Sequence, residues 1–187
     1  MDVADFIAWP GDGTDTRYEL VDGVLRAMAS ASDTHNLIQA NLVALIHAHL
    51  KRARPSCRVV GNPGIQPRLM ADWNFRVPDI GVTCVPNSAA VFMTPDPVLL
   101  IEILSPSNIA DTRENIRAYA TIPTVTELVI VHSTRMKAEV MRRDDKGAWP
   151  KDAEIVDRNG VLRLTSIGAE FAMNDIYDAT HLLRAEM

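Results

Sequence analysis

The chain has 187 residues, of which 47% are hydrophobic and 23% charged, and its formal net charge is −5. These values are typical of a globular protein and exclude a fibrous or disordered chain. No apolar run reaches the length of a membrane span, and the acidic start MDVADFIAWPGDG lacks the basic region of a secretory signal. The negative charge disfavours nonspecific nucleic-acid binding by the surface as a whole. We therefore expect a cytoplasmic protein without a membrane partner, folded as a single domain over residues 1–187.

The segment RYELVDGVLRAM, residues 17–28, predicts an N-terminal β-hairpin. Asp22-Gly23 between two apolar arms is a strong signal for a two-residue hairpin turn. With those residues in the turn, Glu19 faces Arg26 across the two strands.

A long helix is predicted to start near Thr34, with Ser32 or Asp33 as its N-cap. Apolar residues and two histidines then recur at helical spacing: His35, Ile38, Leu42, Leu45, Ile46 and His49. His35 is thus expected at the N-terminal end of the buried stripe. The helix ends in a basic cluster, Lys51, Arg52 and Arg54, which is the best candidate in the sequence for phosphate contacts, although a solvated helix end explains it nearly as well.

The rest of the chain alternates between strand-like and helical segments. Strand patterns occupy 58–85, VLLIEIL (98–104), ELVIVH (127–132), KAEVMRR (137–143) and VLRL (161–164), which is expected to be the last strand. A helix is expected over DTRENIRAYATIP, and irregular or short helical structure after Ser166. The near-continuous hydrophobicity of VLLIEIL indicates a central strand covered on both faces. This order favours an α/β fold with a mixed β-sheet flanked by helices.

The two cysteines, Cys57 and Cys84, are too few and too isolated for a disulfide framework or a zinc site. We expect both to be small, reduced core residues.

Glu102 lies in the middle of the apolar run LLIEILSPS. An unpaired ionised carboxylate in such a strand costs several kcal/mol, so a metal ion, a basic side chain or a proton must meet its charge. Asp79 lies on another predicted strand, and if that strand pairs with the strand of Glu102 the two carboxylates converge. Two oxygen ligands completed by water and substrate phosphates suit Mg²⁺ or Mn²⁺.

An ordered set of motifs gives the chain a family resemblance over roughly residues 15–145. YELVDGVL, SDTHNLIQANL, VPDIGV, LLIEILSPSN, AYATIP and ELVIV follow one another. In this order they resemble the Uma-two family of restriction endonucleases, a branch of the PD-(D/E)XK superfamily. The resemblance implies a restriction-endonuclease-like αβββαβ core and a divalent-metal-dependent endonuclease acting on DNA. It also implies that Asp79 and Glu102 bind the metal and that Glu19 and His35 approach the same cleft.

The sequence departs from the superfamily pattern at the catalytic lysine. That lysine is expected two residues after the second acid, where this chain has Leu104, or in the next helix, at the position that matches Asn115. Arg113 and Arg117 lie on one helix face beside Asn115, and either is a candidate for the missing cation. Losing one transition-state charge partner commonly costs about 10²- to 10³-fold in rate.

Several alternatives remain open from the sequence. Asp79 can be a turn or bulge residue placed by Pro78, and His35 can be a core histidine of the helix stripe. Glu102 can be a buried ion pair, for example with Arg113, and Glu19 can be no more than the cross-strand partner of Arg26. The whole chain can be a catalytically inactive nuclease fold that serves as a nucleic-acid-binding or oligomerisation module. For an active nuclease we expect a homodimer, because two sites related by a twofold axis address both strands of a duplex.

Overall fold

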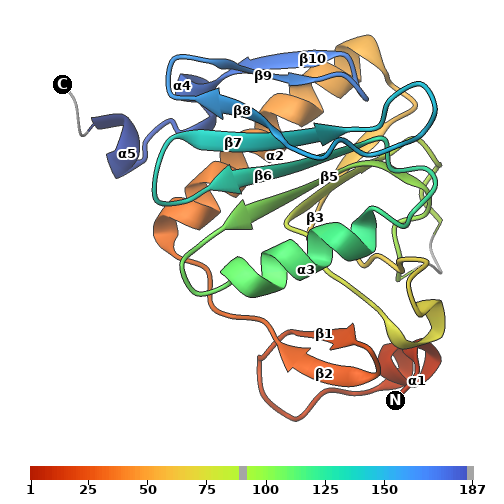
Figure 1. The fold of residues 1–187 in the computed structure, drawn as a ribbon. Coiled ribbons are helices and arrows are strands. Elements are labelled where there is room, and N and C mark those ends of the chain that lie inside the picture. The colour runs from red at the N-terminus through yellow and green to blue at the C-terminus, as the bar shows by residue number, and fades with distance from the viewer. Residues whose placement is uncertain (89–91, 185–187) are drawn as a thin grey trace.

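The computed structural model describes residues 1–88 and 92–184 (Figure 1). Its largest sheet has six strands in the order β3-β4-β5-β6-β7-β8. They span Arg58–Gly61 (β3), Ile80–Thr83 (β4), Pro97–Leu104 (β5), Glu127–His132 (β6), Lys137–Arg142 (β7) and Glu154–Asp157 (β8). β5 and β6 run parallel, whereas the other neighbouring strands are antiparallel. The sheet is therefore mixed, and VLLIEIL is a central strand, as the sequence predicts.

A helix covers each face of this sheet (Figure 1). Helix α2 (Asp33–Ala53), capped by Ser32, buries Ile38, Leu42 and Ile46 against one face. Helix α3 (Ile109–Tyr119) packs Ile116 and Tyr119 against Leu100, Leu104 and Leu128 on the other face. Alternation along β5 therefore places Glu102 on the same face as Leu100 and Leu104, beneath α3. The order α2-β3-β4-β5-α3-β6 is the expected αβββαβ core.

The predicted hairpin is formed by β1 (Tyr18–Val21) and β2 (Val24–Ala27), with Glu19 opposite Arg26. Asp22 and Gly23 have φ of 50° and 83°, which is the left-handed turn geometry that this dipeptide favours. The hairpin packs with α1 (Val3–Ala8) against Phe75 and Val77, close to the short helix η1 (Ala71–Trp73). This contact holds the hairpin beside the start of β4.

The C-terminal region differs from the sequence expectation. VLRL forms β9 (Val161–Leu164), but it is not the last strand, because β10 (Ala169–Ala172) pairs with it in a separate two-stranded sheet. Short helices α4 (Met173–Ile176) and α5 (His181–Arg184) follow. Leu162, Leu164 and Phe171 join the core that also contains α2. The alternation of buried and exposed residues in AEFA, rather than a long apolar run, marks this extra strand.

The prediction of reduced cysteines is wrong, because Cys57 and Cys84 form a disulfide. The register of β3 and β4 pairs Arg58 with Thr83, so the two cysteines, one residue further out, face each other at the end of the ladder. Neither residue's local sequence reveals this, since the pairing depends on register. Disulfides persist mainly in oxidising compartments, so the expectation of a cytoplasmic protein loses the support of free cysteines.

Among the described residues, no helix combines the length and the apolar character needed to cross a bilayer.

Candidate metal and phosphodiester site

A cleft of about 540 Å³ opens where β1, β2, α2, α3 and the paired strands β4 and β5 meet. All five residues that the sequence predicts as catalytic line it, although each comes from a different part of the chain: Glu19, His35, Asp79, Glu102 and Asn115. The fold therefore brings them together and leaves them an opening to solvent.

Asp79 and Glu102 lie at the same end of the β4–β5 pair. Ile80 pairs with Ile101 in the antiparallel ladder, so Asp79, immediately before β4, continues this register towards Glu102 on β5. The Asp79 carboxylate accepts a hydrogen bond from the backbone N–H of Ile103 through Oδ2 (2.6 Å). Its Oδ1 lies 2.9 Å from His35 Nε2. The Asp79 carboxylate is thus held between the backbone of β5 and His35 in the first turn of α2.

The Glu102 side chain is 95% buried, since its residue is only 5% exposed. Its Oε1 accepts hydrogen bonds from Tyr119 Oη (2.9 Å) and Asn115 Nδ2 (3.2 Å). Within the described residues no hydrogen bond reaches Oε2. Burial raises the pKa of Glu102 well above its usual range, and the negative charges of Asp79 and Glu19 raise it further. Glu102 is thus a buried acid to which the protein supplies only neutral donors.

Glu19 is held more tightly by the protein itself. Its Oε1 accepts from the backbone N–H of Val77 (2.7 Å), and its Oε2 accepts from the Arg26 guanidinium (2.7 Å). The residue therefore has the cross-strand ion pair expected from the hairpin register and also lines the cleft. Because the Arg26 guanidinium already meets its charge, Glu19 is better suited to position Arg26 and Asn115 than to ligate a metal.

Asn115 connects the acids to two arginines. Its Oδ1 accepts from Arg26 Nη2 (2.8 Å) and from Arg76 Nη1 (2.9 Å). Its Nδ2 donates to Glu19 Oε1 (3.3 Å) and Glu102 Oε1 (3.2 Å). At the helix position where the family resemblance leads us to expect a lysine, this chain has a neutral amide that accepts from cations on one side and donates to carboxylates on the other.

Neither arginine proposed from the sequence as the missing cation reaches this network. Arg113 forms a forked ion pair with Glu139 on β7, at 2.7 and 3.0 Å. The alternative that Arg113 neutralises Glu102 is therefore wrong, because the Arg113 guanidinium is bound to Glu139 on β7 instead. Arg117 is exposed and does not line the cleft. Leu104, at the other lysine position, is buried against α3, which explains why an apolar side chain fits there.

The basic cluster Lys51, Arg52 and Arg54 lies at the far end of α2 and outside the cleft. His35 and Lys51 are sixteen residues apart, which corresponds to roughly 24 Å along a helix axis. Arg54 donates through Nη1 to the carbonyl of Ser166 (3.0 Å), so part of this cluster joins α2 to the C-terminal region.

Arg76 and Tyr119 are members of the network that the sequence reasoning missed. Arg76 is 1% exposed, and its guanidinium also contacts Asn74 and Glu114. Nothing local in NFRVPDI indicates that this arginine is buried. Tyr119 had a usable signal, because it follows Asn115 by four residues and so shares its helix face. Burial and the charge of Glu102 raise the pKa of Tyr119, which keeps its hydroxyl protonated as a donor.

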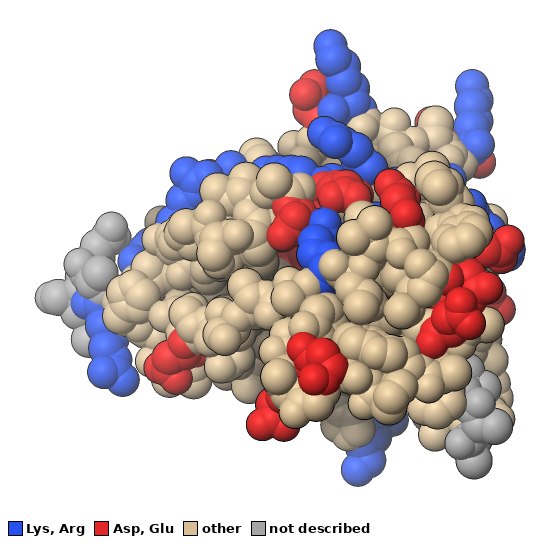
Figure 2. Space-filling view, turned by 90° about the horizontal axis from the view of Figure 1, so that it is seen from below, with Lys and Arg blue, Asp and Glu red and all other residues tan. Residues whose placement is uncertain are grey.

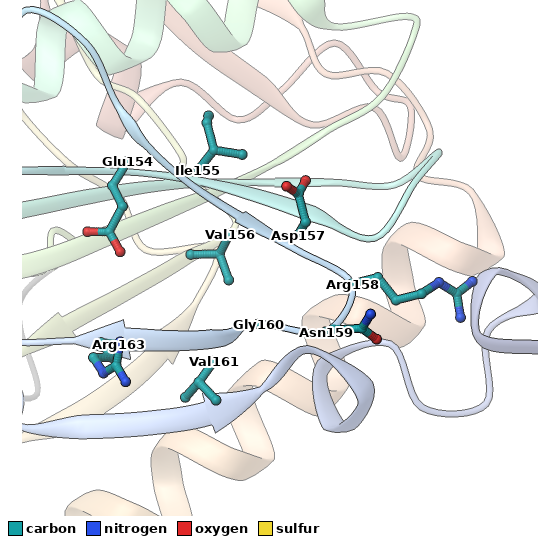
Figure 3. A pocket seen from close by; sticks show the side chains of 9 residues that line it. All are labelled: Glu154, Ile155, Val156, Asp157, Arg158, Asn159, Gly160, Val161 and Arg163. Atoms are coloured by element: carbon teal, nitrogen blue, oxygen red, sulfur yellow. The ribbon is translucent and has the colours of Figure 1, made fainter.

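Two other pockets lack such a convergence of charged groups. One, of about 350 Å³, lies between β8 and β9, and Figure 3 shows Glu154, Asp157 and Arg163 spread around it. It contains none of the predicted site residues. The other, of about 450 Å³, is lined mainly by serine and threonine hydroxyls and shares Ser30 and Ser105 with the cleft. The hydroxyl-lined pocket therefore extends the cleft towards the loop after β6.

The surface seen from the hairpin side has no single dominant charge. In Figure 2 most Lys and Arg side chains of the described residues lie along the upper margin of this face, and acidic side chains lie close to them. This mixed pattern agrees with the net charge of −5. Any nucleic-acid contact on this face must therefore rely on particular side chains rather than on a broad basic surface.

The donor set of the cleft fits a divalent cation held by two carboxylates. Across the described residues no group of three or more His, Cys, Asp and Glu side chains forms a metal site by itself. Mg²⁺, however, is usually bound through one or two carboxylates together with water and phosphate oxygens. The Oε2 of Glu102, which accepts no hydrogen bond among the described residues, and the Asp79 carboxylate meet this requirement, and a cation there would offset the repulsion that Asp79 and Glu19 exert on Glu102.

Comparisons with known proteins agree with this architecture. Residues 3–174 match the sequence model of the Uma2 family, described as "Putative restriction endonuclease". An uncharacterized protein of Synechocystis sp., slr1290, is 33% identical over 165 residues, covering 86% of this chain and 83% of that protein. The crystal structure of a protein from Anabaena variabilis, titled "putative nuclease belonging to DUF820", superposes with a TM-score of 0.75 and 18% identity. That match covers 95% of this chain and 97% of the other, and it shows a shared fold.

Proposed function

Because the chain belongs to the Uma2 family of restriction-endonuclease-like proteins, we propose that it is a divalent-metal-dependent endonuclease that hydrolyses phosphodiester bonds in DNA. The observation that carries this proposal is the pair of carboxylates in one open cleft: Asp79, immediately before β4, and Glu102, on the neighbouring strand β5. Their proposed role is to hold Mg²⁺ or Mn²⁺. Such an ion supplies Lewis-acid charge that polarises the phosphodiester and favours ionisation of the attacking water.

The protein's own side chains then have distinct tasks in this proposal. His35 fixes one oxygen of Asp79 and lines the cleft, and its proposed role is to contact the attacking water or the phosphate. Asn115 and Tyr119 orient Glu102 by donating to the same oxygen and leave the other oxygen free. Asn115 has no proton to exchange at neutral pH, so its task is to position charges.

The wider partners follow from the same proposal. Lys51, Arg52 and Arg54 are proposed to contact phosphates of the DNA away from the cut, and Arg113 and Arg117 remain candidates for such contacts on α3. A homodimer would let two clefts address both strands of a duplex, which analytical ultracentrifugation tests directly.

We place the protein in the cytoplasm with its DNA. Trapping free thiols with an alkylating agent in intact cells tests this placement, because a reducing compartment leaves Cys57 and Cys84 unpaired.

Nicking of a supercoiled plasmid in Mn²⁺ or Mg²⁺ tests the central claim. We expect the purified protein to nick, and Asp79→Ala and Glu102→Ala to abolish nicking. The matched control is Glu170→Ala, which removes an exposed acid on β10 that forms an ion pair with exposed Arg163. Nicking that survives both cleft substitutions would exclude this site as the source of the activity.

A second function is favoured by one specific observation. The lysine positions hold Leu104 and Asn115, and both oxygens of Asp79 already have protein partners. These features favour a catalytically inactive nuclease fold that binds nucleic acid or mediates oligomerisation. Calorimetry with Mn²⁺ and a DNA-binding assay separate the two functions, since the inactive module binds DNA but nicks no better than Glu102→Ala.

A further inference from the structure

The charged side chains that line the cleft are mostly acidic. Within the part of the chain that the structure describes, the only guanidinium groups lining the cleft belong to Arg17 and Arg26. Arg17 is exposed, whereas Arg26 contacts the buried acid Glu19. A phosphodiester that enters this cleft brings further negative charge, so the question is which cation meets it.

The two edges of the Arg26 guanidinium are held differently. Nη2 is fixed by Glu19 (2.7 Å) and by Asn115 (2.8 Å), both buried. Nη1 contacts Asp111 (3.1 Å) and Glu114 (3.0 Å), whose side chains are 51% and 42% exposed. The inner edge is therefore anchored, while the outer edge is held by solvated carboxylates that contribute little and are readily exchanged.

Arg76 is not equivalent to Arg26 in this respect. Its side chain is 1% exposed, it does not line the cleft, and its guanidinium is committed to Asn74, Asn115 and Glu114. Arg76 therefore supports Asn115 from behind, and an incoming phosphate meets Arg26 first.

We propose that Nη1 of Arg26 leaves Asp111 and Glu114 to bind a non-bridging oxygen of the scissile phosphate, and that Arg26 supplies the charge that the absent lysine would provide. The inference rests on the proposed nuclease function and names the residue that completes it. An arginine does not give up its proton in proteins, so Arg26 stabilises charge and takes no part in proton transfer. In this proposal the positive charge comes from β2 of the hairpin, and not from β5 or α3, where the family pattern leads us to expect a lysine.

Plasmid nicking in Mn²⁺ with Arg26→Gln tests this inference. We expect kcat to fall about 10²- to 10³-fold, as for loss of one transition-state charge partner, with a smaller change in KM. The affinity for Mn²⁺, measured by calorimetry without DNA, should be unchanged or tighter, because a positive charge near the acids has been removed. A purely structural role would instead weaken Mn²⁺ binding and thermal stability together. The control is Arg163→Gln, an exposed arginine on β9.

Rescue with a lysine makes the test specific. In the Arg26→Gln background, Asn115→Lys returns a cation to the family position and should recover at least about tenfold in kcat. In the wild-type background the same change should give no gain, because Arg26 and Arg76 already point at that position. If Arg26→Gln does not fold, Arg26→Lys takes its place. A roughly tenfold drop in kcat is then expected, because one ammonium cannot hold Glu19 and the phosphate together.

The possible failures are distinguishable. If wild-type nicking is absent, or survives in Glu102→Ala, the proposed function fails and this inference fails with it. If Glu102→Ala abolishes nicking but Arg26→Gln, or Arg26→Lys in its place, retains the wild-type kcat, only this inference is overturned. A loss of kcat in Arg26→Gln that Asn115→Lys does not rescue also overturns it, since the missing factor would then not be a positive charge at this place.

Discussion

Glu102 and Glu127 are buried acids on adjacent parallel strands, and the fold treats their charges in opposite ways. Glu127 is 0% exposed and lies at the start of β6. Its Oε1 accepts hydrogen bonds from Arg142 and Thr165, and its Oε2 accepts from the N–H and the hydroxyl of Ser166. Within the described residues, Glu102 accepts hydrogen bonds from two neutral donors at Oε1 and from none at Oε2. A buried acid is therefore not in itself a sign of a functional site; an acid left incompletely paired is.

The largest expected difference between Glu102 and Glu127 is in nicking activity. We expect Glu102→Gln to lower nicking on the order of 10³-fold, equivalent to about 4 kcal/mol of transition-state stabilisation. Glu127→Gln should leave the rate per folded molecule close to wild type, because its carboxylate lies at the other end of the strand pair. Plasmid nicking scaled by the folded fraction measures both. Equal losses in the two variants would contradict the distinction.

The next effect should separate them by stability. Glu127→Ala leaves the Arg142 guanidinium and the donors of Thr165 and Ser166 without their shared acceptor. Removing one partner of a buried pair typically costs about 3 kcal/mol or more. Denaturant unfolding should show this loss for Glu127→Ala. The exposed-acid variant Glu170→Ala serves as the control, and a change of less than about 0.5 kcal/mol in Glu127→Ala would contradict the structural role.

Glu139 on β7 provides a third, fully compensated acid with a pH signature. The hydrogen bond from Arg113 lowers its pKa to about 2 although burial raises it, and His132 lowers it further. Because the folded-state pKa lies below the unfolded value, the stabilisation is complete above about pH 4.5 and is lost as the pH falls towards 2.

We expect this contribution to be about 2 kcal/mol, allowing for screening of the partly exposed Arg113. The difference between the unfolding free energies of wild type and Glu139→Gln, measured from pH 7 to pH 2, should begin to shrink below about pH 4.5 and be mostly lost at pH 2. A difference that stays constant with pH would refute the assignment of the low pKa to Glu139.

The smallest expected effect is the change in protein stability when the charge of Glu102, the proposed metal ligand, is removed. Burial and the nearby charges of Asp79 and Glu19 disfavour ionised Glu102, as its raised pKa shows. Without metal, Glu102→Gln should therefore stabilise the protein at neutral pH, because it removes a buried charge that no cation meets. Thermal unfolding in EDTA and in Mn²⁺ tests this, since the gain should shrink or reverse when the wild type binds the ion. A destabilised Glu102→Gln in EDTA would mean that its carboxylate is as well paired as that of Glu127.

Local patterns were sufficient for several parts of the site. The Asp22-Gly23 turn fixes the hairpin register and hence the Glu19–Arg26 pair, and strand alternation places Glu102 on the face under α3. The buried stripe of α2 places His35 at its N-terminal end. These features depend on periods of two and 3.6 residues and on turn chemistry, which neighbouring residues decide.

The sequence by itself thus determined the order of elements, the faces of its strands and helices, and the family to which the chain belongs. The tertiary structure decided which charges meet. It joined Cys57 to Cys84, sent Arg113 to Glu139, and brought Arg26 and Arg76 onto Asn115. Those pairings join residues 26 to 89 positions apart. They are set by strand register and by the packing of the hairpin and α3, and no local propensity specifies either.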